Sequence, residues 1–167
     1  LKEVEPTTWL LGLLGSKISA KDFVLHLQEW DVAAYEMEKF HETYDFFITP
    51  TTAFLPSKIG EQDISKVERM LISLTKTLKL GSVVKRTGIV DQLAETSLQR
   101  TPFTQLANFT GQPAMSVPVY VSKEGLPAGV QFMAARGRED LLLEMAFQLE
   151  RSNLWINVTE NPNYNKN

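Results

Sequence analysis

Residues 105–133 read QLANFTGQPAMSVPVYVSKEGLPAGVQFM, and this stretch decides the fold. A short helix pattern ends at Gly111, and two apolar runs follow at 114–121 and 128–134. The residues between the runs, SKEGLP, are of the types that bend the backbone into turns. The stretch therefore predicts a helix followed by two strands that are joined by a tight turn.

Upstream of this stretch the pattern is mainly helical. A short helix should begin at Pro6 and end at Gly15, since proline suits the first turn and glycine the end of a helix. Ser19 and Asp22 form a start signal for a long helix that runs to about Tyr44. The apolar run at 45–50 predicts a short buried strand that proline ends.

The remaining elements complete an α/β pattern. Helices are expected at 65–78, at 89–98 and at 102–109. A last helix should open at 138–140, with an inward face made of Leu142, Met145, Ala146 and Leu149. This order predicts an α/β fold with a mixed sheet flanked by helices. We expect one domain over 1–160 and a polar tail at 161–167.

Composition excludes several classes of function. The net charge of −3 gives no basic surface for phosphates, so we expect no nucleic-acid partner. The chain has no cysteine, which excludes disulfides and thiolate chemistry and fits a cytoplasmic protein. No apolar run approaches the ~20 residues that span a bilayer, so no membrane partner is expected. No phosphate loop or cofactor motif occurs, and we expect no cofactor and no metal.

The central stretch also carries a family motif. It resembles the C-terminal part of the amidase signature family, whose pattern is roughly N-x-x-G-x-P-A-x-S-x-P followed by G-L-P-x-G-x-Q. The matching residues are Asn108, Gly111, Pro113, Ala114, Ser116, Pro118, Gly125, Leu126, Pro127, Gly129 and Gln131. The segments 44–52 and 58–61 resemble family sequence too.

The resemblance implies an amidase whose catalytic machinery lies elsewhere. The family uses a nucleophilic serine, a bridging serine and a lysine, in and before a Gly/Ser-rich segment that this sequence does not contain. No catalytic residue can therefore be assigned here. The chain opens in the middle of a pattern and without methionine, so we expect the C-terminal part of a longer amidase. Its upstream half would be one partner, and a small-molecule amide the substrate.

Thr101 bears on the choice of substrate. The family that this sequence resembles includes the A subunits of tRNA-dependent amidotransferases. Those subunits have an acidic residue at this position, which helps to recognise the amine of a free amino-acid substrate. Thr101 suits a neutral amide instead, and the V-E-P-x-T-W opening is similar to 6-aminohexanoate-cyclic-dimer hydrolases. Two alternatives stay open: an A-subunit-like part of an amidotransferase, or a non-catalytic binding domain with an amidase-like half-fold.

Five residues are candidates for the wall of a substrate pocket, because they lie next to expected strand or helix ends: Thr51, Thr52, Thr101, Phe103 and Asn108. The alternative is that Thr49 and Thr51 only cap the strand and its turn.

Other chemistry-bearing residues have simpler explanations. His26 and His41 lie on one helix but too far apart to share a metal. Two S-x-x-K patterns, at 73–76 and 82–85, lack the motifs that accompany a catalytic one. Ser116 should be packed inside its strand. Finally, an apolar flank at Trp9, Leu10, Leu13 and Leu14 predicts self-association of the isolated chain.

Overall fold

The computed structural model describes residues 4–16, 18–60, 95 and 98–157. The chain divides into two compact units. The first comprises residues 1–27 and 57–98, and the second residues 28–56 and 99–167. The expected single domain over 1–160 stays a prediction. The helices expected at 65–78 and 89–98 fall almost entirely outside the described residues.

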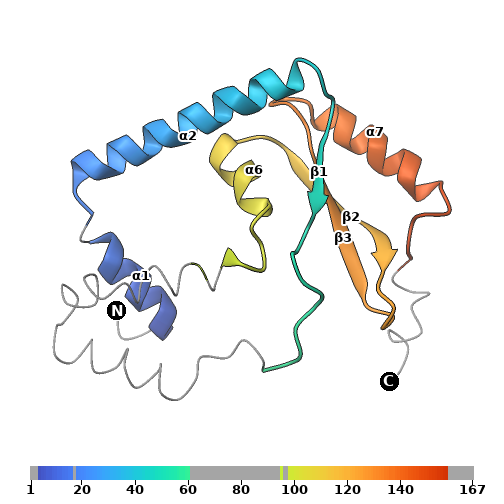
Figure 1. Cartoon of the computed structure of the whole chain (residues 1–167), viewed down its shortest axis with the longest axis horizontal. Helices are drawn as coiled ribbons and strands as arrows, with labels where there is room; N and C mark the ends of the chain where they lie inside the picture. Colours follow the sequence, from blue (N-terminus) through green and yellow to red (C-terminus); the bar gives the residue numbers. More distant parts are fainter. Residues whose placement is uncertain (1–3, 17, 61–94, 96–97, 158–167) are drawn as a thin grey trace. The chain divides into compact units, whose positions relative to one another are not determined.

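The described elements follow the predicted order (Figure 1). They are α1 (Pro6–Gly15), α2 (Ala20–His41), β1 (Phe47–Pro50), α6 (Thr104–Thr110), β2 (Ala114–Val121), β3 (Pro127–Met133) and α7 (Glu139–Glu150). The α/β class is thereby confirmed.

Helix α2 begins where its capping signal places it. The Asp22 backbone N–H donates to Ser19 Oγ at 3.0 Å, and Ser19 Oγ donates to the Asp22 carboxylate at 2.8 Å. The helix ends at His41, a little before the expected Tyr44, whose carbonyl oxygen lies 2.9 Å from His41 Nδ1. None of the residues of α2 is buried, so its apolar stripe is present but largely uncovered.

The three described strands form an antiparallel sheet in the order β1-β3-β2. Thr49 pairs with Gln131, and Gln131 pairs with Ser116 on its other side. Because side chains alternate between faces, these three lie in one row across one face of the sheet. No parallel pair occurs among these strands.

The expectation of a buried strand at 45–50 is wrong for most of its residues. Only Thr49 is buried in β1, and Ile48 is 55% exposed. The physical reason is position, since β1 lies at an edge of the described sheet and has one strand neighbour. Pro50 fits such an edge, because it has no N–H to donate to a further strand.

The β2–β3 connection is the predicted turn. Ser122 N–H donates to Leu126 O at 2.8 Å, and Ser122 Oγ accepts from the N–H groups of Glu124 and Leu126. Gly125 takes a positive φ of 78°, which a residue without Cβ adopts at little cost. A register irregularity between Val117 and Tyr120 accommodates Pro118 within β2.

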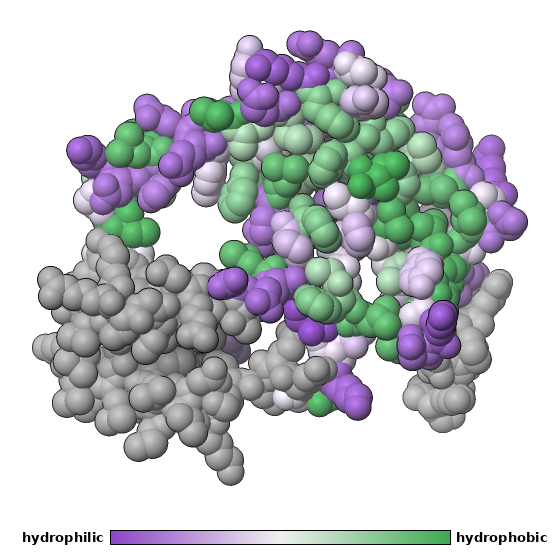
Figure 2. Space-filling model, in the orientation of Figure 1, coloured by the Kyte–Doolittle hydropathy of each residue, from purple (hydrophilic) through white to green (hydrophobic). Residues whose placement is uncertain are grey.

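The hydrophobic core lies between the sheet and α7. Val117, Phe132, Ala134 and Leu142 are its buried members, and Met145 and Leu149 pack against them as predicted for the inner face of α7. Phe46 meets Phe132 edge to face, with ring centroids 5.9 Å apart. Figure 2 shows the apolar side chains gathered over the strands and the inner side of α7, with hydrophilic residues along its outer side.

Candidate functional site

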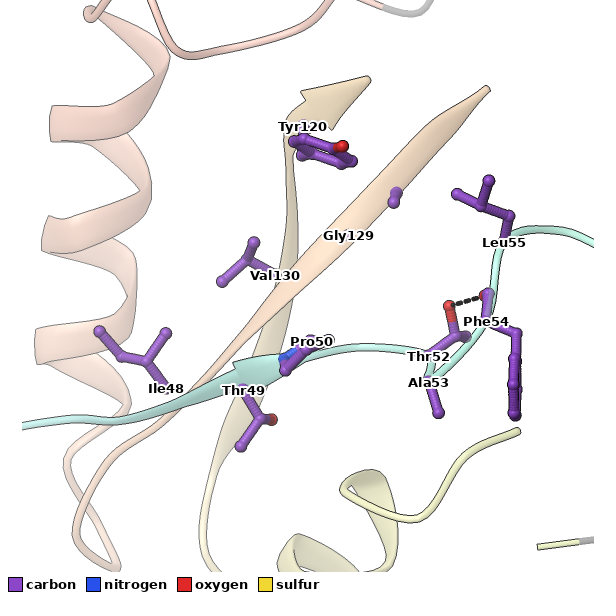
Figure 3. A pocket seen from close by; sticks show the side chains of 11 residues that line it. Ile48, Thr49, Pro50, Thr52, Ala53, Phe54, Leu55, Tyr120, Gly129 and Val130 are labelled. Carbon is purple, nitrogen blue, oxygen red and sulfur yellow. Dashed lines mark hydrogen bonds between the residues drawn. The ribbon is translucent and has the colours of Figure 1, made fainter. Parts of the chain in front are cut away.

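The face of the sheet opposite α7 carries polar residues. Thr49, Thr51, Ser116, Gly129 and Gln131 alternate with the core residues of their strands, and together we call them the polar face. Helix α6 lies on this side of the sheet and α7 on the other (Figure 3). None of these residues ionises, so the polar face offers hydrogen bonds without charge.

Gln131 connects the sheet to the start of α6. Its side chain is 4% exposed, and its Nε2 lies 3.4 Å from Thr49 Oγ1 and 3.5 Å from the carbonyl oxygen of Phe103. Phe103 occupies the N-cap position of α6 without a side-chain cap. The contacts are long, but a buried amide with two partners holds the first turn of α6 over the end of β1.

Ser116 and Thr51 meet above Gly129. Their hydroxyl oxygens lie 2.6 Å apart, although one residue belongs to β2 and the other follows β1. Gly129 of β3 lies between them, and a Cβ there would clash with Ser116 Oγ and come within 2.7 Å of Thr51 Oγ1. The missing side chain of Gly129 is therefore what allows the two hydroxyls to meet across the central strand.

The segment 51–55 is held in place at both ends. Thr51 N–H donates to Gly129 O at 3.0 Å, and Ala53 N–H donates to Arg100 O at 2.9 Å. Arg100 Nη2 donates to Leu55 O at 2.7 Å, and its guanidinium lies 5.5 Å from the centre of the Phe54 ring. Arg100 thus joins this segment to the residues that precede α6.

An open groove of about 500 Å³ lies beside β1 and β3. Its lining is mainly apolar and includes Ile48, Pro50, Leu55, Tyr120 and Val130. Figure 3 shows Ile48 and Val130 pointing away from the side that Thr49 occupies. Thr49 and Gly129 also line the groove, so the groove adjoins two residues of the polar face.

The structure brings together some of the five predicted pocket residues. Thr51 belongs to the polar face, and Phe103 joins it through Gln131. Thr101 lies in the turn before α6, where its carbonyl accepts from Thr104 Oγ1 at 3.2 Å. Thr101 and Phe103 lie at the start of α6, and the assignment of pocket contact to all three residues stays a prediction.

The other two predicted residues point elsewhere. Thr52 Oγ1 donates to Phe54 O at 2.9 Å, so its hydroxyl serves its own turn, and the residue lines the groove. Asn108 is exposed, and its Nδ2 donates to Thr104 O at 3.1 Å on the same helix. Each of these side chains therefore makes a local hydrogen bond, and the assignment of pocket contact to them stays a prediction.

Ser116 differs from its expectation. It is exposed rather than packed inside its strand, because its side chain lies on the polar face and not on the core face. Within the described residues, no group of three His, Asp or Glu side chains is placed to hold a metal ion. No helix in the described part of the chain is long and apolar enough to cross a membrane.

Sequence reasoning placed Gln131, Gly129 and Ser116 in a motif without assigning them a role at a site. Two signals could have found them. A glycine inside a strand pattern indicates a close approach of another group, and a glutamine within an apolar strand requires a hydrogen-bond partner.

Comparison with known proteins identifies the class of protein to which this chain belongs. The Amidase family model matches residues 5–143, and the chain belongs to the amidase family. The chain is 35% identical over 150 residues to a lipoamidase from Enterococcus faecalis, which covers 90% of the chain and 20% of that protein. It is 33% identical over 155 residues to a 6-aminohexanoate-cyclic-dimer hydrolase from Paenarthrobacter ureafaciens, covering 92% of the chain and 28% of that protein.

Solved structures agree with these relatives. A 6-aminohexanoate cyclic dimer hydrolase complexed with substrate matches 89% of the chain and 28% of its own length, with a TM-score of 0.67 and 32% identity. The A subunit of a glutamyl-tRNA(Gln) amidotransferase from Thermotoga maritima matches with a TM-score of 0.52 and 23% identity, which shows a shared fold alone. The predicted resemblance is confirmed, and the chain spans only 20% and 28% of the length of these two curated relatives.

Proposed function

We propose that this chain is the C-terminal part of an amidase that hydrolyses uncharged carbon–nitrogen amide bonds, linear or cyclic. The observation that carries the proposal is the family match over residues 5–143, together with two relatives whose names describe amide hydrolysis. The particular amide, of which a cyclic 6-aminohexanoate dimer is one example, is part of the proposal.

The catalytic set is proposed to lie outside this chain. Amide hydrolysis needs a nucleophile, a base and donors for the developing oxyanion. Ser116 is the serine of the polar face, and its side-chain partner is the Thr51 hydroxyl, which does not serve as a base. The family's Ser-Ser-Lys set would therefore come from the upstream half, and this chain would contribute sheet and pocket wall.

The choice of uncharged amides rests on Thr101. A carboxylate at this position would attract the amine of a free amino acid, and charge-assisted hydrogen bonds contribute roughly 1.5–3 kcal/mol. The threonine cannot make that interaction, and the polar face beyond Phe103 carries no charge either. Both features favour a neutral substrate near the first turn of α6.

The test uses the complete amidase that contains this chain. We expect it to hydrolyse a neutral alkyl amide faster than glutamine, and Thr101→Asp to raise the ratio of glutamine to neutral-amide kcat/KM by several-fold. Asn153→Asp, which adds the same charge at an exposed position after α7, should leave the ratio unchanged. A wild-type preference for glutamine would favour the amidotransferase alternative, and no hydrolysis of any amide would favour a binding domain.

A further inference from the structure

We propose that the Ser116–Thr51 hydroxyl pair is a binding site for an uncharged secondary amide, with Gly129 as the residue whose missing Cβ leaves room for the two hydroxyls to meet. The inference rests on the proposed function only for its choice of ligand. The pair itself is a feature of the described sheet.

Counting hydrogens shows that the pair has a donor to spare. Each hydroxyl carries one hydrogen and two acceptor lone pairs. At 2.6 Å one of the two hydrogens lies between the oxygens, so the other hydroxyl keeps its hydrogen for a further acceptor. The described residues give neither hydroxyl another hydrogen-bond partner, and Ser116 is exposed.

The chemistry of the pair matches an amide. A secondary amide has one carbonyl acceptor and one N–H donor, and two linked hydroxyls can donate one bond and accept another at neighbouring points. A charged ligand would be a poorer match, because no residue of the polar face carries a compensating charge. No residue of the polar face can act as a base either, so the pair is a binding group rather than a nucleophile.

Gly129 leaves the space above the central strand that the two hydroxyls occupy. A Cβ at this position would overlap the space between the two oxygens and force them apart. The Thr51 N–H bond to Gly129 O fixes the distance between the outer and central strands, so the pair is held before any ligand arrives. Pre-organised donors of this kind lose little freedom when they bind.

The neighbouring contacts favour this face over the groove. Gln131 and the Phe103 carbonyl continue the polar row toward Thr101, the position that the proposed function links to substrate choice. The groove beside β1 is mainly apolar and reaches this polar row at Thr49 and Gly129. An amide held by the pair would therefore lie on the side of the sheet that carries α6.

The experiment measures binding of ε-caprolactam, an uncharged cyclic secondary amide, to the complete amidase by titration calorimetry or ligand-observed NMR. We expect Ser116→Ala and Thr51→Val each to raise the Kd by roughly 3- to 10-fold, the effect of one neutral hydrogen bond. Thr51→Ser, which keeps the hydroxyl, should restore near wild-type binding, and Gly129→Ala should weaken binding at least as much as Ser116→Ala.

Matched controls separate binding from loss of fold. Thr43→Val changes an exposed threonine outside the site, and Gly12→Ala adds a methyl group where no atom lies within 4 Å. Both should leave the Kd unchanged, and the melting temperature of each variant shows whether it folds. No lactam binding by the wild type, or an unchanged Kd in both Ser116→Ala and Thr51→Val, would overturn the inference.

The two proposals fail in different ways. Hydroxyl-dependent lactam binding by a protein that hydrolyses no amide would support this site and contradict the proposed function. Amide hydrolysis with a Kd that is indifferent to both hydroxyls would support the function and contradict the site.

Discussion

Single residues carry the polar side of this sheet, and each does so through a contact that its residue type makes possible. Gly129 permits a close approach because it has no Cβ, and Gln131 reaches two partners because its amide carries two N–H groups. Thr51 adds a hydroxyl at the end of an edge strand, where its own N–H is already bonded to Gly129 O. Substituting Thr51 or Gln131 would leave a neighbour without its partner, and a Cβ at Gly129 would clash with the hydroxyls of Ser116 and Thr51.

A residue-scale prediction concerns the pKa of Asp140. The Arg138 guanidinium donates to both carboxylate oxygens, at 2.9 and 3.0 Å, and these hydrogen bonds hold the pKa of Asp140 below its ordinary value. The lowered pKa adds stability above the unfolded value of about 3.9, and this contribution is lost as the pH falls through the folded pKa. Because the pair is exposed, the effect on stability should be small.

The measurement is an NMR titration of the Asp140 carboxyl. Arg138→Met removes the donors and should raise the pKa of Asp140 toward its ordinary value. Arg151→Met, a change to an exposed arginine after α7, serves as the control. An Asp140 midpoint that does not move in Arg138→Met would contradict the assigned cause.

At the scale of elements, local signals set the boundaries of the helices. Ser19 starts α2 by accepting the Asp22 N–H, and Gly111 ends α6 with a left-handed φ of 66°. Arg136 also supports the end of α6, where its Nη2 donates to Thr110 O at 2.6 Å. Such contacts form between near neighbours or at helix ends, where unpaired backbone groups are always present.

The Ser19 cap yields a prediction for α2. Ser19→Ala should reduce the free energy of unfolding by about 1 kcal/mol and lower the helical circular dichroism signal, because α2 has no buried residue to compensate. Ser19→Thr should retain most of the cap. Ser16→Ala, which removes a hydroxyl bonded to Leu13 O after α1, is the control for losing a serine nearby. Equal urea midpoints for Ser19→Ala and wild type would contradict the role of the cap.

The sequence predicted the elements better than it predicted the site. The strand at 114–121, the turn after it and the helix after Arg138 depend on patterns within a few residues, and all three are confirmed. The contacts of the polar face join residues that are 65 and 82 positions apart in Thr51–Ser116 and Thr49–Gln131. No local pattern encodes such a contact, which depends on the register of three strands.

The same reason explains the two expectations that were wrong. A run of apolar residues predicts burial but not which neighbours will supply it, and β1 has only β3 beside it in the described sheet. Ser116 was expected to be packed because its sequence neighbours are apolar. Alternation places it on the opposite face from those neighbours, so the serine points away from the core.

At the scale of the whole molecule, the isolated chain should have no amidase activity. Within the described residues, the side-chain partner of Ser116 is the Thr51 hydroxyl, which cannot act as a base, and the sequence offers no Gly/Ser-rich catalytic segment. Incubation with aryl amides and with cyclic 6-aminohexanoate dimer should give no hydrolysis above buffer. Hydrolysis that disappears in Ser73→Ala or Ser116→Ala would show that this chain carries a nucleophile of its own.

The exposed apolar residues of α2 bear on association. Phe23 is 56% exposed, Val24 53% and Trp30 43%, although Trp30 stacks on Phe109 with ring centroids 5.1 Å apart. Trp9 and Leu13, two residues of the flank expected on α1, are half-buried, whereas Leu11, which was not part of that flank, is 69% exposed. The apolar surface available to a partner is therefore found on α2 as well as on α1.

We expect the isolated 18.9 kDa chain to self-associate, since covering one large apolar side chain is worth roughly 1.5–3 kcal/mol and several of them can act together. Sedimentation velocity over a wide concentration range should show a shift from monomer toward dimer. Phe23→Lys should move that shift to higher concentration, because a charge on the apolar stripe must be desolvated in any contact. Gln28→Lys, which adds the same charge at a polar position of α2, should have a smaller effect. A monomer at every concentration, with no binding of a dye for apolar surfaces, would mean that the chain closes its own core and needs no partner.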